Sequence, residues 1–288
     1  MNSEDIQFIK IKDLPIYAAS GLAKSKNSFY VVSDDERSIF QFQLNDHSFK
    51  ETLLHPTVLP TDHQERKRLK PDWEALVYFQ DLNALLAVPS GSKANRQTGY
   101  FIPLDANPIK PIPVDFAKIY QKLQHHFDEL NIEGAVVLGS TFKLLQRGNG
   151  KSKQNAIITF NLHEILEGIQ SSQSLPAQLS FKIQSFTLPE LDGSAFSFTD
   201  GFALDHYLFF LAVCEETNST YEDGPYKGAL LGQIDENEKI KAMWRLHCPF
   251  KPEGLWMEKT NESYQVYLVT DADSREQVSS LFVGKLQR

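Results

Sequence analysis

Short apolar runs separated by turn-like residues follow one another along nearly the whole chain. The first group consists of three such runs, "GLAKS", "SFYVVS" and "SIFQFQL", between residues 21 and 44. These runs are rich in Phe, Tyr, Val and Ile, whose side chains suit the pleated surface of a β-strand. The pattern therefore predicts an all-β protein built from short antiparallel strands.

This group of three runs recurs, so the chain reads as five similar units. Each unit opens with a polar residue followed by a small one, and these openings stand roughly 60 residues apart. They are Ser20-Gly21, Glu74-Ala75, Glu133-Gly134, Asp200-Gly201 and Glu253-Gly254. Self-similarity at a fixed period is typical of repeat architectures, in which each unit buries its apolar faces against its neighbours.

A fourth apolar run follows each of the first four groups, at residues 49–54, 111–116, 181–188 and 239–246. The fifth group reaches the C-terminus without one, and residues 6–12, "IQFIKIK", have the pattern to supply it by pairing with residues 280–286. Four-stranded units closed by a strand from the opposite terminus describe a β-propeller, and the closure covers an otherwise exposed strand edge. We therefore predict a β-propeller of five four-stranded blades, with six blades as the alternative.

The propeller is expected to form a single domain over residues 1–288 with two helical inserts. Apolar residues at helical spacing predict a helix near 115–130, and a second short helix is expected near 161–169. The basic run "QERKRLKP", residues 64–71, is interpreted as a solvated loop between blades, with Lys70 entering the channel just ahead of Glu74.

The repeated polar residue is predicted to face one mouth of the central channel. In a propeller blade the first strand lines the channel and the second runs antiparallel to it, so the start of the first and the end of the second lie together. This places Glu74, Glu133, Asp200 and Glu253 around one mouth, with Ser20 completing the ring. The ends of the second strands and the loops beyond them add Asp34, Ser90, Lys93, Arg96, Arg147, Glu215, Asp271 and Asp273.

Converging carboxylates are costly, because two like unit charges 4 Å apart repel by about 4 kcal/mol at an effective dielectric constant near 20. They must take up protons, pair with Arg or Lys, or bind a cation. Oxygen-rich surroundings without cysteine favour Ca²⁺, with ligands among Glu74, Glu133, Asp200, Glu253 and Asp271. Two alternatives stay open: the carboxylates accept hydrogen bonds from backbone amides of the next blade, or they bind a polar ligand without an ion.

The segments "KPEGLWME…VYLVTDADS" and "NIEGAVVL…FKLLQRGNG" resemble the repeats of esterase-like phytase domains, relatives of the calcium-dependent β-propeller phytases. They are also similar to the senescence-marker-protein and gluconolactonase propellers. The resemblance implies a metal at the channel mouth and hydrolysis of phosphoesters or lactones, with Glu74, Glu133, Asp200, Glu253 and Asp271 as the matching positions. The chain departs from the pattern at Ala75, which replaces a glycine, and at Ser20, which replaces an acid.

The first functional hypothesis is a metal-assisted hydrolase of phosphoesters or related esters. A bound ion polarises the ester and activates water, Glu133 acts as the base and Arg147 orients an anionic group. Lys93, Arg96, Asp34 and Glu215 are the expected ligand-binding residues. A lactonase-like hydrolase is one alternative, and a non-catalytic propeller that binds a ligand or a protein is another, because a fold does not determine a function.

The amino-acid composition limits the classes of molecule that this protein is expected to bind. The formal net charge is −8, from 29 basic and 37 acidic residues, whereas a nucleic-acid-binding protein needs a basic face to neutralise phosphates. The longest apolar run, residues 208–214, is too short to span a bilayer. The N-terminal "MNSEDIQF" lacks the basic and apolar pattern of a secretory signal, and the 2 cysteines are too few for a disulfide scaffold. We therefore expect a cytoplasmic protein with a small anionic ligand or ester substrate, and neither nucleic acid nor membrane as partner.

Overall fold

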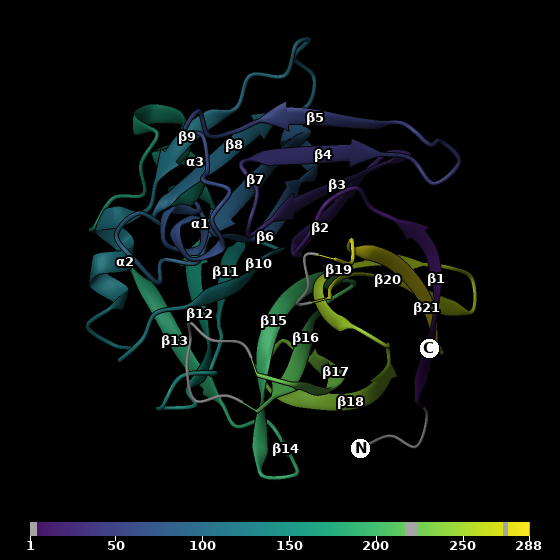
Figure 1. Cartoon of the computed structure of the whole chain (residues 1–288). Coiled ribbons are helices and arrows are strands. Elements are labelled where there is room, and N and C mark those ends of the chain that lie inside the picture. Colours follow the sequence, from purple (N-terminus) through teal and green to yellow (C-terminus); the bar gives the residue numbers. More distant parts are fainter. Residues whose placement is uncertain (1–4, 217–223, 273–275, 288) are drawn as a thin grey trace.

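The fold is a ring of β-sheets around a central axis (Figure 1). The computed structural model describes residues 5–216, 224–272 and 276–287. The first three units of the repeat each form a separate four-stranded sheet. The first consists of β2 (Ala19–Ser25), β3 (Ser28–Ser33), β4 (Ser38–Phe42) and β5 (Phe49–Leu53). The second consists of β6 (Trp73–Phe79), β7 (Ala84–Pro89), β8 (Thr98–Pro103) and β9 (Ile112–Asp115). The third consists of β10 (Ile132–Leu138), β11 (Thr141–Gln146), β12 (Asn155–Asn161) and β13 (Phe181–Phe186).

The last two units share one nine-stranded sheet, so the prediction of five separate blades is only partly confirmed. Four strands of the fourth unit are β15 (Ser194–Leu204), β16 (Tyr207–Glu215), β17 (Tyr226–Ile234) and β18 (Ile240–His247), and the two-residue β14 (Glu190–Leu191) pairs with β15. The fifth unit contains β19 (Lys251–Lys259), β20 (Ser263–Asp271) and β21 (Ser280–Gln287).

The N-terminal strand β1 (Ile6–Asp13) joins these two units. It pairs antiparallel with β21, as the sequence predicts. Its first residues also pair in parallel with β18, with Ile6 opposite Leu246 and Gln7 opposite His247. Because β1 forms hydrogen bonds along both edges, it merges two units that the repeat pattern predicts as separate sheets.

The innermost strands nevertheless form a closed ring of five. Each of β2, β6, β10, β15 and β19 packs against the next, and β19 packs against β2. Glycine permits the close approach at the axis: a Cβ atom on Gly21 would lie 2.6 Å from the backbone nitrogen of Leu76, and one on Gly254 would lie 2.7 Å from the carbonyl oxygen of Ser20. The fold is therefore propeller-like, with its middle closed by backbone contact.

Apolar clusters fill the spaces between neighbouring sheets. The cluster between the second and third sheets includes Phe116, Tyr120 and Phe142, all fully buried. Between the first and last sheets, the rings of Phe29 and Tyr267 meet edge to face with centroids 5.2 Å apart. Burial of apolar surface between sheets is the main stabilising contribution in such a ring.

In the part of the chain that the structure describes, three α-helices and a short 3₁₀ turn interrupt the strands. The two inserts predicted near 115–130 and 161–169 contain α2 (Ala117–Leu123) and α3 (Leu162–Ser172), and η1 (Gln80–Leu82) links β6 to β7. The expected loop at residues 64–71 is instead largely a helix, α1 (His63–Leu69), because Asp62 caps it by accepting a hydrogen bond from the Glu65 amide at 2.8 Å. Among the described residues, no helix has the length and apolar character needed to cross a membrane.

Candidate functional site

Each innermost strand carries a β-bulge at or beside the polar residue that opens its repeat. The pairing with the second strand skips Glu74 in β6, Glu133 in β10 and Glu253 in β19. In β2, Ser20 and Gly21 together oppose the single residue Val32. A bulge leaves one residue out of the ladder and re-aims its side chain. The bulges therefore direct the side chains of these three glutamates toward one mouth of the ring.

The fourth unit differs, because its bulge falls on Thr199 and not on Asp200. A shift of one residue sends a side chain to the opposite face of the strand. Asp200 accordingly accepts a backbone hydrogen bond from Leu255 of β19 and one from Gly201, both at 2.7 Å. Burial raises the pKa of Asp200 well above its usual value, and these two hydrogen bonds oppose that shift. Asp200 therefore joins two innermost strands, as the backbone-amide alternative describes, and is not one of the mouth residues.

The two hydroxyl-bearing residues at the bulges connect neighbouring strands. The Ser20 hydroxyl donates to the Trp73 carbonyl at 2.6 Å, and the Thr199 hydroxyl donates to the Pro252 carbonyl at 3.2 Å. Each acceptor is the residue just before a glutamate of the next unit. Three carboxylates thus remain of the predicted ring.

These three glutamates line a small polar cavity of about 60 Å³, which we call the polar mouth. Its walls come from all of the units except the fourth and from the connecting loops. They are Ala18, Ala19, Ser20, Asp34, Lys67, Lys70, Asp72, Glu74, Arg96, Asn131, Glu133, Arg147, Asn149, Lys251, Glu253 and Asp271.

One group of charges at the polar mouth surrounds Lys70. Its ammonium lies 3.2 Å from Asp72 Oδ1 and 3.4 Å from Asp35 Oδ1, and it also contacts Asp34. Arg96 Nη1 lies 2.7 Å from the second oxygen of Asp72. Sequence reasoning missed Asp72. Its backbone lies in the left-handed region (φ 61°), so the segment is not regularly extended, and the spacing Lys70, Asp72, Glu74 gave no reliable signal that the three side chains share a face.

A second group surrounds Arg147. Its guanidinium lies 3.3 Å from Glu133 Oε2 and also contacts Glu215. The Asn131 amide donates to the other Glu133 oxygen at 2.7 Å. The side chains of Arg147, Glu133 and Glu215 are at most 6% exposed, so this is a buried network in which removal of one member leaves an uncompensated charge.

Lys251 extends this network to the last unit. Its ammonium lies 3.4 Å from Glu215 Oε1, 3.2 Å from Glu253 Oε1 and 3.9 Å from Asp271 Oδ2. Burial raises the pKa of Glu253 well above its usual value, and the positive charges of Lys251 and Arg147 oppose that shift. Sequence reasoning also missed Lys251, which stands two residues before Glu253 as Asp72 stands two residues before Glu74.

Glu74 differs from its neighbours, because its carboxyl group has neither a hydrogen bond nor an ion pair with any residue that the structure describes. Burial raises its pKa well above the usual value. The negative charges of Glu133, Asp72 and Asp34 add to the shift, and Lys70 opposes it. Glu74 is therefore a carboxyl group that holds its proton at a pH where an ordinary glutamate has lost it.

The carboxylate oxygens that could bind a cation lie beside Glu74 in the polar mouth. Oxygens of Asp34, Asp72 and Glu74 all lie within 4.8 Å of one another. Asp34 Oδ1 is buried and has no hydrogen-bond partner among the described residues, and burial raises the pKa of Asp34 to about 8. An all-oxygen set of this kind fits Ca²⁺ chemically. Lys70 contacts two of the three carboxylates, so its ammonium and a metal ion would compete for the same oxygens.

The predicted site residues divide into three sets. Glu74, Glu133, Glu253, Asp271, Asp34, Arg96 and Arg147 line the polar mouth. Glu215 lies behind it as a partner of Arg147 and Lys251. Asp200 and the half-buried Lys93 do not line it, and Asp273 lies outside the described residues.

Comparison with known proteins defines the family and the fold. The sequence profile described as "Family of unknown function (DUF6929)" matches residues 15–286. No curated protein matches the sequence. The glutaminyl cyclase of Myxococcus xanthus superposes with a TM-score of 0.54 at 8% identity, covering 99% of each chain.

Two further structures score lower. They are the calcium-binding protein regucalcin of Agrobacterium tumefaciens (TM-score 0.49, 7% identity, 99% of this chain and 97% of that one) and an exo-1,5-α-L-arabinanase from a bovine ruminal metagenomic library (0.48, 8%, 96% and 94%). These two superpositions carry no argument, whereas the superposition on the glutaminyl cyclase, at 8% identity, shows the propeller-like fold alone.

Proposed function

The chain belongs to the family of unknown function DUF6929, and we propose that it is a five-bladed, propeller-type hydrolase of small phosphoesters or related esters that acts at the polar mouth. The proposal rests on one observation. Among the carboxylates that line this cavity, Glu74 alone has no partner in the described part of the chain, while its surroundings raise its pKa. Perturbed, unpaired carboxyl groups in a cleft are candidates for proton transfer.

Glu74 therefore takes the acid–base role that the sequence suggested for Glu133. The Glu133 carboxylate already forms an ion pair with Arg147 and accepts a hydrogen bond from Asn131. In its protonated form Glu74 donates a proton to a leaving oxygen, and in its ionised form it accepts one from water. Arg147 and Arg96, fixed by their own carboxylate partners, supply positive charge for the anionic group of the substrate.

A divalent cation, when bound, would be held by Asp34, Asp72 and one oxygen of Glu74. It would keep Glu74 ionised, so that in this state Glu74 acts only as the base for water, and it would polarise the ester and lower the pKa of a water molecule. The support is the all-oxygen donor set and the unpartnered buried oxygen of Asp34. Because Lys70 shares these oxygens, Lys70→Met is expected to tighten Ca²⁺ binding, measured by calorimetric titration. Unchanged or weaker binding in this variant would count against a cation at these carboxylates.

The test of hydrolysis is a panel of aryl phosphoesters, lactones and carboxylic esters, each assayed with Ca²⁺ and with a chelator. Glu74→Gln should abolish turnover without loss of stability. Asp200→Asn is the matched control: Asp200 opens the fourth repeat but lies outside the cavity, so this variant should lose stability and keep turnover. Turnover by Glu74→Gln at the wild-type rate would refute the assigned role.

A non-catalytic binding function is the second candidate. It is favoured by the small volume of the cavity, about 60 Å³, and by the pairing of most of its charges with one another. Absence of turnover on every substrate of the panel, together with calorimetric binding of Ca²⁺ or inorganic phosphate, would favour this function over hydrolysis.

A further inference from the structure

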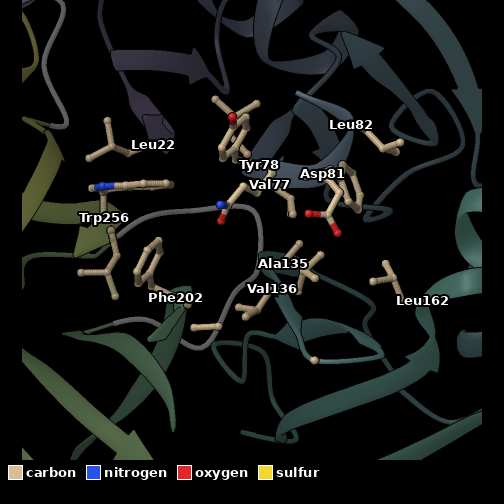
Figure 2. A pocket seen from close by; sticks show the side chains of 18 of the residues that line it. Leu22, Val77, Tyr78, Asp81, Leu82, Ala135, Val136, Leu162, Phe202 and Trp256 are labelled. Carbon is tan, nitrogen blue, oxygen red and sulfur yellow. The ribbon is translucent and has the colours of Figure 1, made fainter. Parts of the chain in front are cut away.

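A second cavity opens at the opposite mouth of the ring. It has a volume of about 340 Å³ and is lined by the later residues of the innermost strands, by η1 and by one side of α3. Its walls include Leu22, Val136, Leu162, Phe202 and Trp256 (Figure 2). We call this cavity the apolar mouth. It falls in the size range of small-molecule sites, which are mostly apolar with a few placed polar groups.

The two mouths are separate cavities. No residue of the described chain lines both. Between them the innermost strands meet at the axis, where a Cβ atom on Gly21 or Gly254 would clash with the backbone of the next strand. A ligand of the apolar mouth therefore does not reach Glu74, and this inference is independent of the proposed hydrolysis.

One wall of the apolar mouth is aromatic. The rings of Phe202 and Trp256 pack edge to face with centroids 4.7 Å apart, and both side chains are only partly buried. A neighbouring pair of half-exposed aromatic rings offers apolar contact area at little entropic cost, because their rotamers are already held by mutual packing.

The charge of the apolar mouth has one sign. Asp81, an exposed residue of η1, is the only ionisable acid or base among the described residues that line it, apart from the phenol of Tyr78. Figure 2 shows Asp81 across the cavity from Trp256 and Phe202. The Tyr78 hydroxyl is already engaged with Ser25 and Asn83, both at 3.1 Å. Charge complementarity therefore favours a cation over an anion at this end.

From these features we infer that the apolar mouth binds a small hydrophobic amine, with its ammonium group at Asp81 and its apolar body on the Phe202–Trp256 wall. The separation of the carboxylate from the aromatic pair requires a ligand with a polar head and an apolar body. A compact inorganic cation would leave the aromatic wall uncovered, and a carboxylic acid would meet the negative charge of Asp81.

The test compares three probes of nearly equal size by calorimetric titration: 2-phenylethylamine, 2-phenylethanol and 3-phenylpropionate. The amine should bind most tightly, the alcohol more weakly by up to about fivefold, the discrimination expected from one exposed charge pair, and the carboxylate most weakly. Trp256 is the only partly exposed tryptophan of the three, since Trp73 is 0% and Trp244 8% exposed. Amine binding should therefore change the protein's tryptophan fluorescence.

Asp81→Asn should remove the preference for the amine over the alcohol while leaving the affinity for the alcohol unchanged. Glu167→Gln, which removes an exposed charge of α3 that does not line the cavity, is the matched control and should keep the preference. Equal binding of amine and alcohol to the wild type, or an unchanged preference in Asp81→Asn, would overturn the assignment of a cation. Failure of all three probes to bind at millimolar concentration would overturn the site itself.

Discussion

Replacement of Asp200 by alanine should destabilise the protein strongly, although this residue lines neither the polar mouth nor the apolar mouth. The carboxylate accepts hydrogen bonds from the backbone N–H groups of Leu255 and Gly201, both at 2.7 Å. Leu255 is 1% exposed and Gly201 is buried, so the two N–H groups would lose their acceptor at positions with little contact with solvent. Each unsatisfied buried N–H group costs about 1–3 kcal/mol.

The expected loss for Asp200→Ala is therefore about 2–6 kcal/mol of unfolding free energy, from two orphaned groups. Burial of the Asp200 carboxyl group is itself unfavourable, as its raised pKa indicates. The alanine variant no longer buries this group, so the expected loss lies toward the lower end of this range. Asp200→Asn keeps one carbonyl acceptor and should lose about half as much. Urea denaturation followed by circular dichroism measures these differences.

Glu74→Gln is the contrasting variant in the same assay. Its carboxyl group has no partner among the described residues, so the substitution removes a repelling charge and no hydrogen bond. It should be neutral or stabilising at pH 8. Two outcomes would refute the assignment of the two acids to different roles. One is an unfolding free energy of Asp200→Ala equal to that of the wild type, and the other is a larger loss of unfolding free energy in Glu74→Gln than in Asp200→Ala.

Three other perturbations test the remaining parts of the structure. Arg147→Met removes the cation from a buried network with Glu133 and Glu215 and should cost about 3–5 kcal/mol; a loss below about 1 kcal/mol in denaturant titration would contradict it. Burial raises the folded-state pKa of Glu74 above 4.5, so the folded protein keeps a proton that the unfolded chain has lost. The unfolding free energy of the wild type should therefore fall relative to that of Glu74→Gln by up to about 1.4 kcal/mol per pH unit as the pH rises from 4.5 to the folded-state pKa. Above that pKa the difference between the two proteins should stay constant. Parallel curves of unfolding free energy against pH over that range would exclude the pKa shift. Deletion of residues 1–12 removes β1 and exposes the edges of β18 and β21, so the melting temperature should drop sharply in calorimetry, whereas an unchanged value would refute the closure.

The sequence alone determined the features that depend on local patterns. Alternating apolar residues and turn residues act within a few positions of one another, so they identify the repeated strands and the two helical inserts. The pairing of β1 with β21 followed from counting these strands, because the fifth unit lacks a fourth strand and β1 is left over. The same period places Glu74, Glu133 and Glu253 at equivalent points of three strands. Their convergence at one mouth followed from that equivalence.

Only the tertiary structure decided which carboxyl groups pair with a basic side chain or a backbone amide and which do not. The fourth bulge falls on Thr199 because of how β15 pairs with β16, and that one-residue difference turns Asp200 from the channel mouth to the amide of Leu255. The same holds for Lys70 and Lys251, whose ammonium groups contact acids of other units as well as their own. Register and the choice of charge partners depend on contacts between segments far apart in the chain, and no local pattern carries that information.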